Sequence, residues 1–126
     1  MTTLSRTDLI AHAEAWIRDW NGHDVDGVIA PWAEDGVFIS PVAAAVTGSP
    51  LIRGKPALKA YWQGALARAG SLHFTPLSLQ VDPETQSLLV HYQSRTSARQ
   101  VRAAELMVFE NGKQVRGEAF YGAEMP

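Results

Sequence analysis

The 126-residue chain contains no cysteine. This absence excludes disulfide bridges, thiolate metal ligands and cysteine nucleophiles together, and it is compatible with a reducing cytoplasm. No apolar run approaches the roughly 18 residues that a membrane-spanning helix needs. Residues 1–10 carry Arg6 and Asp8 and lack the apolar stretch of a secretory signal. We therefore expect a cytoplasmic protein with no membrane partner.

The chain also lacks an excess of charge of either sign. The chain has 11 lysine and arginine residues against 13 aspartate and glutamate residues, a formal net charge of −2 at pH 7. Without a basic cluster, nucleic acid is not an expected partner. The four histidines are dispersed, and His12 is expected on the solvated side of a helix. There is no metal-binding histidine motif, phosphate loop or dinucleotide fingerprint, so we expect no metal and no cofactor.

The composition that remains is that of a globular protein. Hydrophobic residues make up 46% of the chain and charged residues 19%. The length suits one hydrophobic core, and the sequence contains no repeat, low-complexity tract or long linker. We expect residues 1–126 to form a single domain.

The first half of the chain has helical periodicity. Apolar residues spaced by four, three and four positions predict one buried helical face: Leu9, Ala13, Trp16 and Trp20. Asp24 is expected to cap a second, shorter helix that carries Trp32 near its end. A short strand is predicted at residues 37–40, residues 41–50 resemble a loop or lid, and a third helix is predicted from about residue 56 to 69.

After residue 70 the periodicity changes to two. Strands are predicted at about 73–82, 87–96, 100–110 and 113–122. Asn-Gly at 111–112 is a strong signal for a two-residue hairpin turn. Helices followed by hairpin-linked strands indicate an α+β fold, with an antiparallel sheet curled around the helices.

Several segments in this order resemble the nuclear transport factor 2-like superfamily, in particular its SnoaL-like and ketosteroid-isomerase-like branches. The segments are residues 16–21, 24–29, 34–38, 40–41, 53–58, 111–115 and 119–122. The resemblance spans about residues 5–122 and implies a cone-shaped, curved antiparallel sheet wrapped around three helices from the N-terminal half. This fold hosts isomerases, cyclases, hydrolases, dehydratases, transport factors and catalytically silent domains, so it does not assign an activity.

The isomerase branch is informative where this sequence departs from it. The resemblance places the branch's proton-shuttling aspartate, which precedes a proline, at Ser40, and serine at its ordinary pKa cannot serve as that base. The branch's oxyanion-hole tyrosine falls at Trp16 and a supporting tyrosine at Trp62. Its oxyanion-hole acid remains a carboxyl, at Glu105. Steroid isomerisation by the family mechanism is therefore not expected.

The strand pattern suggests a pair of catalytic carboxyl groups. If residues 111–112 form a two-residue turn, an unbroken register places Glu105 opposite Glu118. Two carboxyl groups at that spacing inside a pocket could not both ionise cheaply, so an acid would lie beside a base. The alternatives are a structural ion-pair network with Arg102 or Arg116, or a bulge that shifts the register and separates the two glutamates.

The resemblance makes the face of Glu105 the concave face that lines the cone. The candidate substrate-binding residues are Trp16, Trp32, Phe38, Ser40, Trp62, Met107, Arg116 and Phe120. Aromatic stripes at helical spacing are more often plain core, which is the alternative for the tryptophans. A cavity lined by indoles would instead accept a small apolar molecule and donate N–H groups to its carbonyl.

The outer face of the sheet is expected to carry Leu89, Leu106 and Val108 among polar neighbours such as Arg102 and His91. The simplest pairing sets His91 opposite Ala104, whereas a shift of one residue would bring it onto the pocket face. A solvated sheet face is usually more polar than this. The pattern favours a homodimer formed through the outer face, as the resemblance also implies. The alternative is that the C-terminal tail covers these residues.

Three functions are compatible with the sequence. The first is a SnoaL-like, cofactor-free acid–base enzyme, either isomerase, cyclase, dehydratase or hydrolase, acting on an apolar carbonyl-bearing or cyclic substrate through Glu105 and Glu118. The second is a domain that binds a ligand in the same cavity without catalysis, which Ser40 favours. The third is an oligomer-assembly domain whose cavity is filled core. We rank the first above the second and the third last, and we leave open whether the protein is an enzyme.

Overall fold

The computed structural model describes residues 2–126. Its helices and strands, in chain order, are α1 (Arg6–Asn21), α2 (Val25–Ile29), β1 (Trp32–Ile39), α3 (Pro41–Thr47), β2 (Leu51–Arg53), α4 (Lys55–Ala69), β3 (Leu72–Asp82), β4 (Ser87–Thr96), β5 (Gln100–Glu110) and β6 (Lys113–Glu124). The six strands form one curved, unclosed sheet in the order β2-β1-β6-β5-β4-β3. Every neighbouring pair is antiparallel except β1 and β6, which are parallel.

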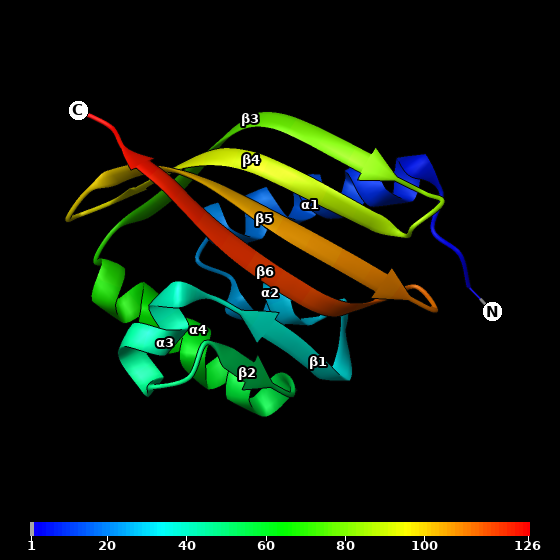
Figure 1. Ribbon diagram of the computed structural model, residues 1–126, viewed down its shortest axis with the longest axis horizontal. Helices are drawn as coiled ribbons and strands as arrows, with labels where there is room; N and C mark the ends of the chain where they lie inside the picture. The colour runs from blue at the N-terminus through cyan, green and yellow to red at the C-terminus, as the bar shows by residue number, and fades with distance from the viewer. Residues whose placement is uncertain (1) are drawn as a thin grey trace.

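The helices lie on one side of the long strands. In Figure 1, α1 lies behind strands β3–β6, while α3 and α4 lie beside β1 and β2. The core fills the space between these helices and the concave face of the sheet. The α+β class and the curved sheet around helices are confirmed. No helix among residues 2–126 is long and apolar enough to cross a membrane.

Helix α1 begins at a reciprocal cap. The hydroxyl of Ser5 accepts a hydrogen bond from the Asp8 N–H at 3.1 Å, and the Asp8 carboxylate accepts one from the Ser5 N–H at 2.9 Å. These two bonds satisfy backbone donors that would otherwise lack partners in the first turn. The predicted apolar face is confirmed, because its four residues are the buried ones: Leu9, Ala13, Trp16 and Trp20.

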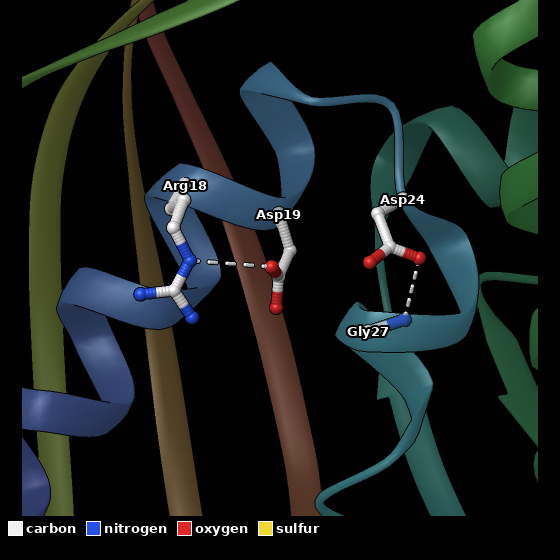
Figure 2. Close-up of polar contacts among 4 residues, drawn as sticks. All are labelled: Arg18, Asp19, Asp24 and Gly27. Atoms are coloured by element: carbon white, nitrogen blue, oxygen red, sulfur yellow. Dashed lines mark hydrogen bonds and ion pairs between the residues drawn. The ribbon is translucent and has the colours of Figure 1, made fainter.

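The corner between α1 and α2 depends on a glycine. As predicted, Asp24 caps α2, and its Oδ1 accepts a hydrogen bond from the Gly27 N–H at 2.9 Å (Figure 2). The neighbouring carboxylate of Asp19 lies 3.6 Å from the Nε of Arg18. A Cβ on Gly27 would lie 2.7 Å from Asp24 Oδ2 and 2.9 Å from Asp19 Cγ. The missing side chain therefore lets both carboxylates approach the start of α2.

The sequence predicted Trp32 near the end of the second helix. In the structure it is instead the first residue of strand β1. Helix α2 ends at Ile29, since Pro31 has no N–H to continue the helical ladder. The indole of Trp32 then lies across two glycines of the sheet. A Cβ on Gly36 would lie 2.5 Å from Trp32 Cε3, and one on Gly117 would lie 3.1 Å from Trp32 Cη2. This packing fixes how β1 sits against β6.

Residues 41–50 are not the loop expected from the sequence, because Pro41–Thr47 form helix α3. The hydroxyl of Ser40 caps this helix by accepting a hydrogen bond from the Val42 N–H at 3.1 Å. Proline is well tolerated in a first helical turn. Gly48, with φ of +86°, ends the helix in the left-handed conformation that glycine adopts readily. The local signals are those of a helix, although it is only seven residues long.

The four long strands agree closely with prediction, and β4 and β5 have the predicted bounds. The β5–β6 hairpin turns at residues 111–112, and Phe109 pairs with Gln114 as expected. The next pair is Val108 with Arg116, so β6 contains one extra residue, Val115. This β-bulge moves residues 116–121 of β6 to the face opposite the one predicted.

His12 is not solvated as expected but lies half-buried between α1 and the sheet. Its Nε2 is 3.2 Å from Gln114 Oε1, and its ring meets the Phe109 ring edge-on at 4.7 Å. Burial lowers the pKa of His12, and the hydrogen bond to Gln114 opposes part of this effect. The contact ties α1 to the start of β6.

Candidate functional site

A cavity of about 240 Å³ lies between the concave face of the sheet and helices α1, α3 and α4. Its volume is slightly below the range of about 300–1,000 Å³ that is typical of sites for drug-sized ligands. The cavity therefore suits a smaller molecule. Eight of its eighteen lining residues are aromatic: Trp16, Trp20, Phe38, Tyr61, Trp62, Phe74, Tyr92 and Tyr121.

The aromatic wall is held by contacts between rings. Trp16 stacks on Phe74 at 5.3 Å between ring centres and meets the ring of Tyr92 edge-on at 5.2 Å. On the opposite side, Trp62 meets Phe38 edge-on at 5.3 Å. Trp16, Phe38 and Trp62, three of the candidate substrate-binding residues, are thus in the cavity wall.

Glu105 is the one acidic residue among those that line the cavity. It is 6% exposed. None of the side-chain hydrogen bonds or ion pairs among residues 2–126 involves its carboxyl group. Burial alone raises the pKa of Glu105 to about 8. At pH 7 the group is therefore mainly protonated, and it presents an O–H donor to the cavity.

The strand pairing sets two tyrosines beside this acid. Tyr92 of β4 and Tyr121 of β6 both pair with Ala103, two residues before Glu105 in β5. Such diagonal neighbours are roughly 7–8 Å apart, within reach of long side chains. The small side chain of Ala103 leaves room between the two phenols. Ala119, which pairs with Glu105 itself, is equally small.

The two phenols remain protonated at neutral pH. Burial, followed by the charge of Glu105, raises the pKa of Tyr92 well above its ordinary value. Tyr121 is 39% exposed as a whole, but burial around its hydroxyl, again followed by Glu105, raises its pKa to about 12. The inner part of the cavity therefore contains three neutral O–H groups.

Ser40 lies behind the cavity wall rather than in it. It is 1% exposed, and its hydroxyl is engaged as the cap of α3. As a hydrogen-bond partner it also lowers the pKa of Tyr61 and of Tyr121, against the larger effect of burial. It thus supports two tyrosines of the wall, whereas the sequence led us to expect a direct donor to the ligand.

The bulge in β6 corrects three expectations at once. Glu118 pairs with Leu106 on the outer face, so it does not oppose Glu105. Arg116 and Phe120 follow the same alternation and are exposed on the outer face. The extra residue reverses which side chains of β6 face the cone. The predicted pairing of Glu105 with Glu118 is wrong, and a catalytic role for Glu118 beside Glu105 loses its geometric basis.

Two other candidates are core residues. Met107 is fully buried on the same face as Glu105 but is outside the cavity wall. Trp32 is 2% exposed, and its ring lies 5.5 Å from that of Trp62. Its indole fills the space above the two glycines rather than the cavity.

Most residues of the wall were not predicted from the sequence, and five of them carry phenol or guanidinium groups. Tyr61, Tyr92 and Tyr121 supply phenols, while Arg68 and Arg99 are exposed at the mouth of the cavity. The period-two alternation of residues 87–96 could have indicated the inward side of Tyr92. Nothing local in the sequence brings the end of α4 to the β4–β5 turn. Among residues 2–126, no three histidine, aspartate or glutamate side chains gather as a metal site would require.

Comparison with known proteins identifies a matching family and similar solved structures. The SnoaL-like domain profile matches residues 13–117. A SnoaL-like protein of unknown function from Burkholderia thailandensis is 25% identical, with a TM-score of 0.84 over 95% of this chain and 99% of that one. A protein with a cystatin-like fold from Methylobium petroleophilum is 23% identical, with a TM-score of 0.81 over 99% and 82% of the two chains.

A third solved structure is that of an enzyme. The epoxide hydrolase/cyclase-like enzyme SalBIII, described for its role in pyran ring formation in the polyether salinomycin, is 16% identical. Its TM-score is 0.75, over 94% of this chain and 93% of that one. At this identity the likeness shows a shared fold. No curated protein matches the chain.

Proposed function

The chain belongs to the SnoaL-like domain family, and from that premise we propose that it is a cofactor-free acid–base enzyme. Its substrate is a small apolar molecule, carbonyl-bearing or cyclic, bound in the cavity. The reaction is an isomerisation, cyclisation, dehydration or hydrolysis, with Glu105 as the catalytic acid. SalBIII, named as epoxide hydrolase/cyclase-like, supports the proposal at the level of the fold.

The observation that carries the proposal is the unpaired carboxyl group of Glu105 at a cavity. Burying such a group without a partner costs free energy, and most buried polar groups in proteins do have one. A side chain whose pKa is displaced by burial, and which faces a pocket, is a candidate for acid–base catalysis. A ligand oxygen that accepts the Glu105 proton would supply the missing hydrogen bond.

The mechanism follows from three neutral donors that line one cavity. Protonated Glu105 donates to a carbonyl, epoxide or leaving-group oxygen of the substrate. Tyr92 and Tyr121 lie close enough to orient that oxygen or to donate as well. As negative charge develops on the oxygen, these hydrogen bonds strengthen in the low dielectric of the cavity. Because no second carboxyl lines the wall, Glu105 first gives its proton to the substrate oxygen. The carboxylate that remains then takes a proton from the substrate, or from the attacking hydroxyl or water, and returns to its acid form.

The test is turnover of a panel of small cyclic enones, epoxides and lactones. The variants are Glu105→Gln and, as the matched control, Glu118→Gln, which changes a carboxyl on the outer face of the neighbouring strand. We expect Glu105→Gln to lower kcat by about 10²–10⁴-fold, the usual contribution of a general acid. Glu118→Gln should leave kcat unchanged. If Glu105→Gln turned over every accepted substrate at the native rate, the assignment would be wrong.

Ligand binding without catalysis is the second candidate, and one observation favours it. The position where the isomerase branch has its base is Ser40, which is buried and engaged as a helix cap. A binding protein would retain ligands in both the native chain and Glu105→Gln and would convert none of the panel. Binding and turnover measured on the same samples separate the two functions.

We also propose that two copies pair through the outer face of the sheet, which is turned toward the viewer in Figure 1 because α1 lies behind it. Leu89, Leu106 and Val108 are only half-buried there, and Phe120 is 47% exposed. The Nε of Arg102, on the same face, is buried without a hydrogen-bond partner. Buried polar atoms rarely lack one, so an acceptor from a second copy would complete this face.

The oligomeric state tests this pairing directly. Light scattering coupled to size exclusion should give twice the chain mass for the native protein and the monomer mass for Phe120→Glu. Leu77→Glu, which changes an exposed apolar residue of edge strand β3, is the control and should remain dimeric. A monomeric native protein would refute the pairing.

A further inference from the structure

The mouth of the cavity carries two arginines. Arg68 lies in the last turn of α4, and Arg99 lies in the turn between β4 and β5. Both line the cavity and both are exposed, whereas Glu105 is buried at its inner end. Among residues 2–126, neither arginine forms an ion pair with an acidic side chain. The other lining residues are uncharged, so the mouth is positive and the interior neutral.

The two arginines are held at the same rim by Ser97. The N–H of Ser97 donates to the carbonyl of Ala69, next to Arg68, at 3.1 Å. The hydroxyl of Ser97 accepts a hydrogen bond from the Ser71 N–H at 2.9 Å. These bonds fasten the β4–β5 turn to the end of α4. The rim is therefore a built feature of the fold rather than a chance approach of two long side chains.

Further contacts hold each of the two arginines in place. The N–H of Thr96 donates to the carbonyl of Arg99 at 2.9 Å, which closes the turn and places Arg99 beside the cavity. The guanidinium of Arg68 lies 5.7 Å from the centre of the Tyr61 ring. It passes over Gly64, where a Cβ would lie 3.2 Å from Arg68 Nη1. Stacking of this kind holds a guanidinium in place without neutralising its charge.

Both charges act on the phenols of the wall. Arg68 lowers the pKa of Tyr61, and Arg99 lowers that of Tyr121, in each case against the larger effect of burial. The charge of each guanidinium group thus reaches a phenol of the cavity wall. An anion placed at the mouth would interact with both.

We infer that the molecule bound in the cavity is a small apolar carboxylic acid, whose carboxylate is held by Arg68 and Arg99 while its body fills the aromatic interior. Arginine presents several N–H donors in a planar fork that suits a carboxylate. The far end of the acid reaches Glu105, where a carbonyl oxygen accepts the proton. This inference rests on the proposed function for that second contact, but the carboxylate contact stands without catalysis.

Matched pairs of acid and amide test the inference. The first pair is 4-acetylbenzoate and 4-acetylbenzamide, which share a ring and a ketone and differ in charge. A second pair is 4-oxocyclohexanecarboxylate and its amide. Binding is measured by calorimetry and by quenching of tryptophan fluorescence, to which the indoles of the wall contribute. We expect each acid to bind roughly tenfold more tightly than its amide, as for hydrogen bonds to a charged group.

The variants separate the two arginines from other cations of the hairpin. Arg68→Gln and Arg99→Gln should each weaken acid binding several-fold and leave amide binding unchanged, and the double variant should abolish the preference. Arg95→Gln is the control, since Arg95 is exposed and bonds Gln100 in the same hairpin, and it should leave the preference intact. Added salt should weaken binding of the acids and not of the amides.

The outcomes distinguish this inference from the proposed function. Equal affinity for acid and amide, or failure of both acids to bind at millimolar concentration, would overturn the inference. Retention of the preference in the double variant would overturn it as well. Glu105→Gln should keep the preference for acids, because its carboxyl lies at the other end of the cavity. Loss of turnover in that variant is judged separately, so either idea can fail alone.

Discussion

The buried carboxyl of Glu105 should make the protein lose stability as the pH rises. Its pKa is about 8 in the folded chain and 4.5 when unperturbed. Between these values the folded chain retains a proton that the unfolded chain has released. The contribution of Glu105 to the free energy of unfolding is therefore complete below pH 4.5 and is lost as the pH rises through 8. The perturbation that isolates this effect is Glu105→Gln, which keeps the neutral side chain at every pH.

The magnitude follows from the two pKa values. Each pH unit within the window costs about 1.4 kcal/mol, so the whole window corresponds to on the order of 5 kcal/mol. Between pH 6 and 9 the free energy of unfolding of Glu105→Gln should rise relative to that of the native chain by on the order of 2–3 kcal/mol, mostly before pH 8. Burial lowers the pKa of His12, which removes stability on the acid side instead, below its ordinary value of 6.5. His12 is present in both proteins, so its contribution cancels in the difference.

The assay is urea unfolding followed by tryptophan fluorescence, at pH 6, 7, 8 and 9 and constant ionic strength. The control is Glu118→Gln, whose free energy of unfolding should change with pH in parallel with that of the native chain. If the curve of Glu105→Gln were also parallel to the native one, Glu105 would ionise as an ordinary exposed carboxyl does. Both the raised pKa and the acid role would then be refuted.

Two further predictions concern packing and capping. Gly36→Ala should destabilise the protein by about 1–3 kcal/mol in urea unfolding, because its Cβ would overlap the buried ring of Trp32. Gly64→Ala, in a helix and facing only a flexible arginine, should be neutral or stabilising; an equal loss in both variants would contradict this account. Ser40→Ala should cost about 1 kcal/mol through the lost cap of α3. Urea unfolding measures this loss, and an unchanged free energy of unfolding would show that the cap contributes nothing.

The sequence alone determined the elements whose signals are local. The apolar face of α1 repeats at helical spacing, and β4 and β5 alternate at period two, so both follow from neighbouring residues. The Asn-Gly turn at 111–112 likewise depends on two adjacent residues. From these the α+β class follows, whereas the inward face of Glu105 was expected from the family resemblance. Each of the local signals is a short-range property, which is why no tertiary information was needed.

The tertiary structure decided which residues meet. The extra residue Val115 changed which side chains of β6 face the cone, and it moved Glu118 to the face opposite Glu105. No local pattern in the sequence marks this bulge. Two longer-range contacts accompany the bulge: the Gln114 N–H donates to the carbonyl of Pro31, and Trp32 packs over Gly117. The phenols beside the acid and the arginines at the mouth come together in the same way, across elements distant in the chain. Periodicity tells which face a side chain is on, but only packing between elements sets the register and so determines which groups share the cavity.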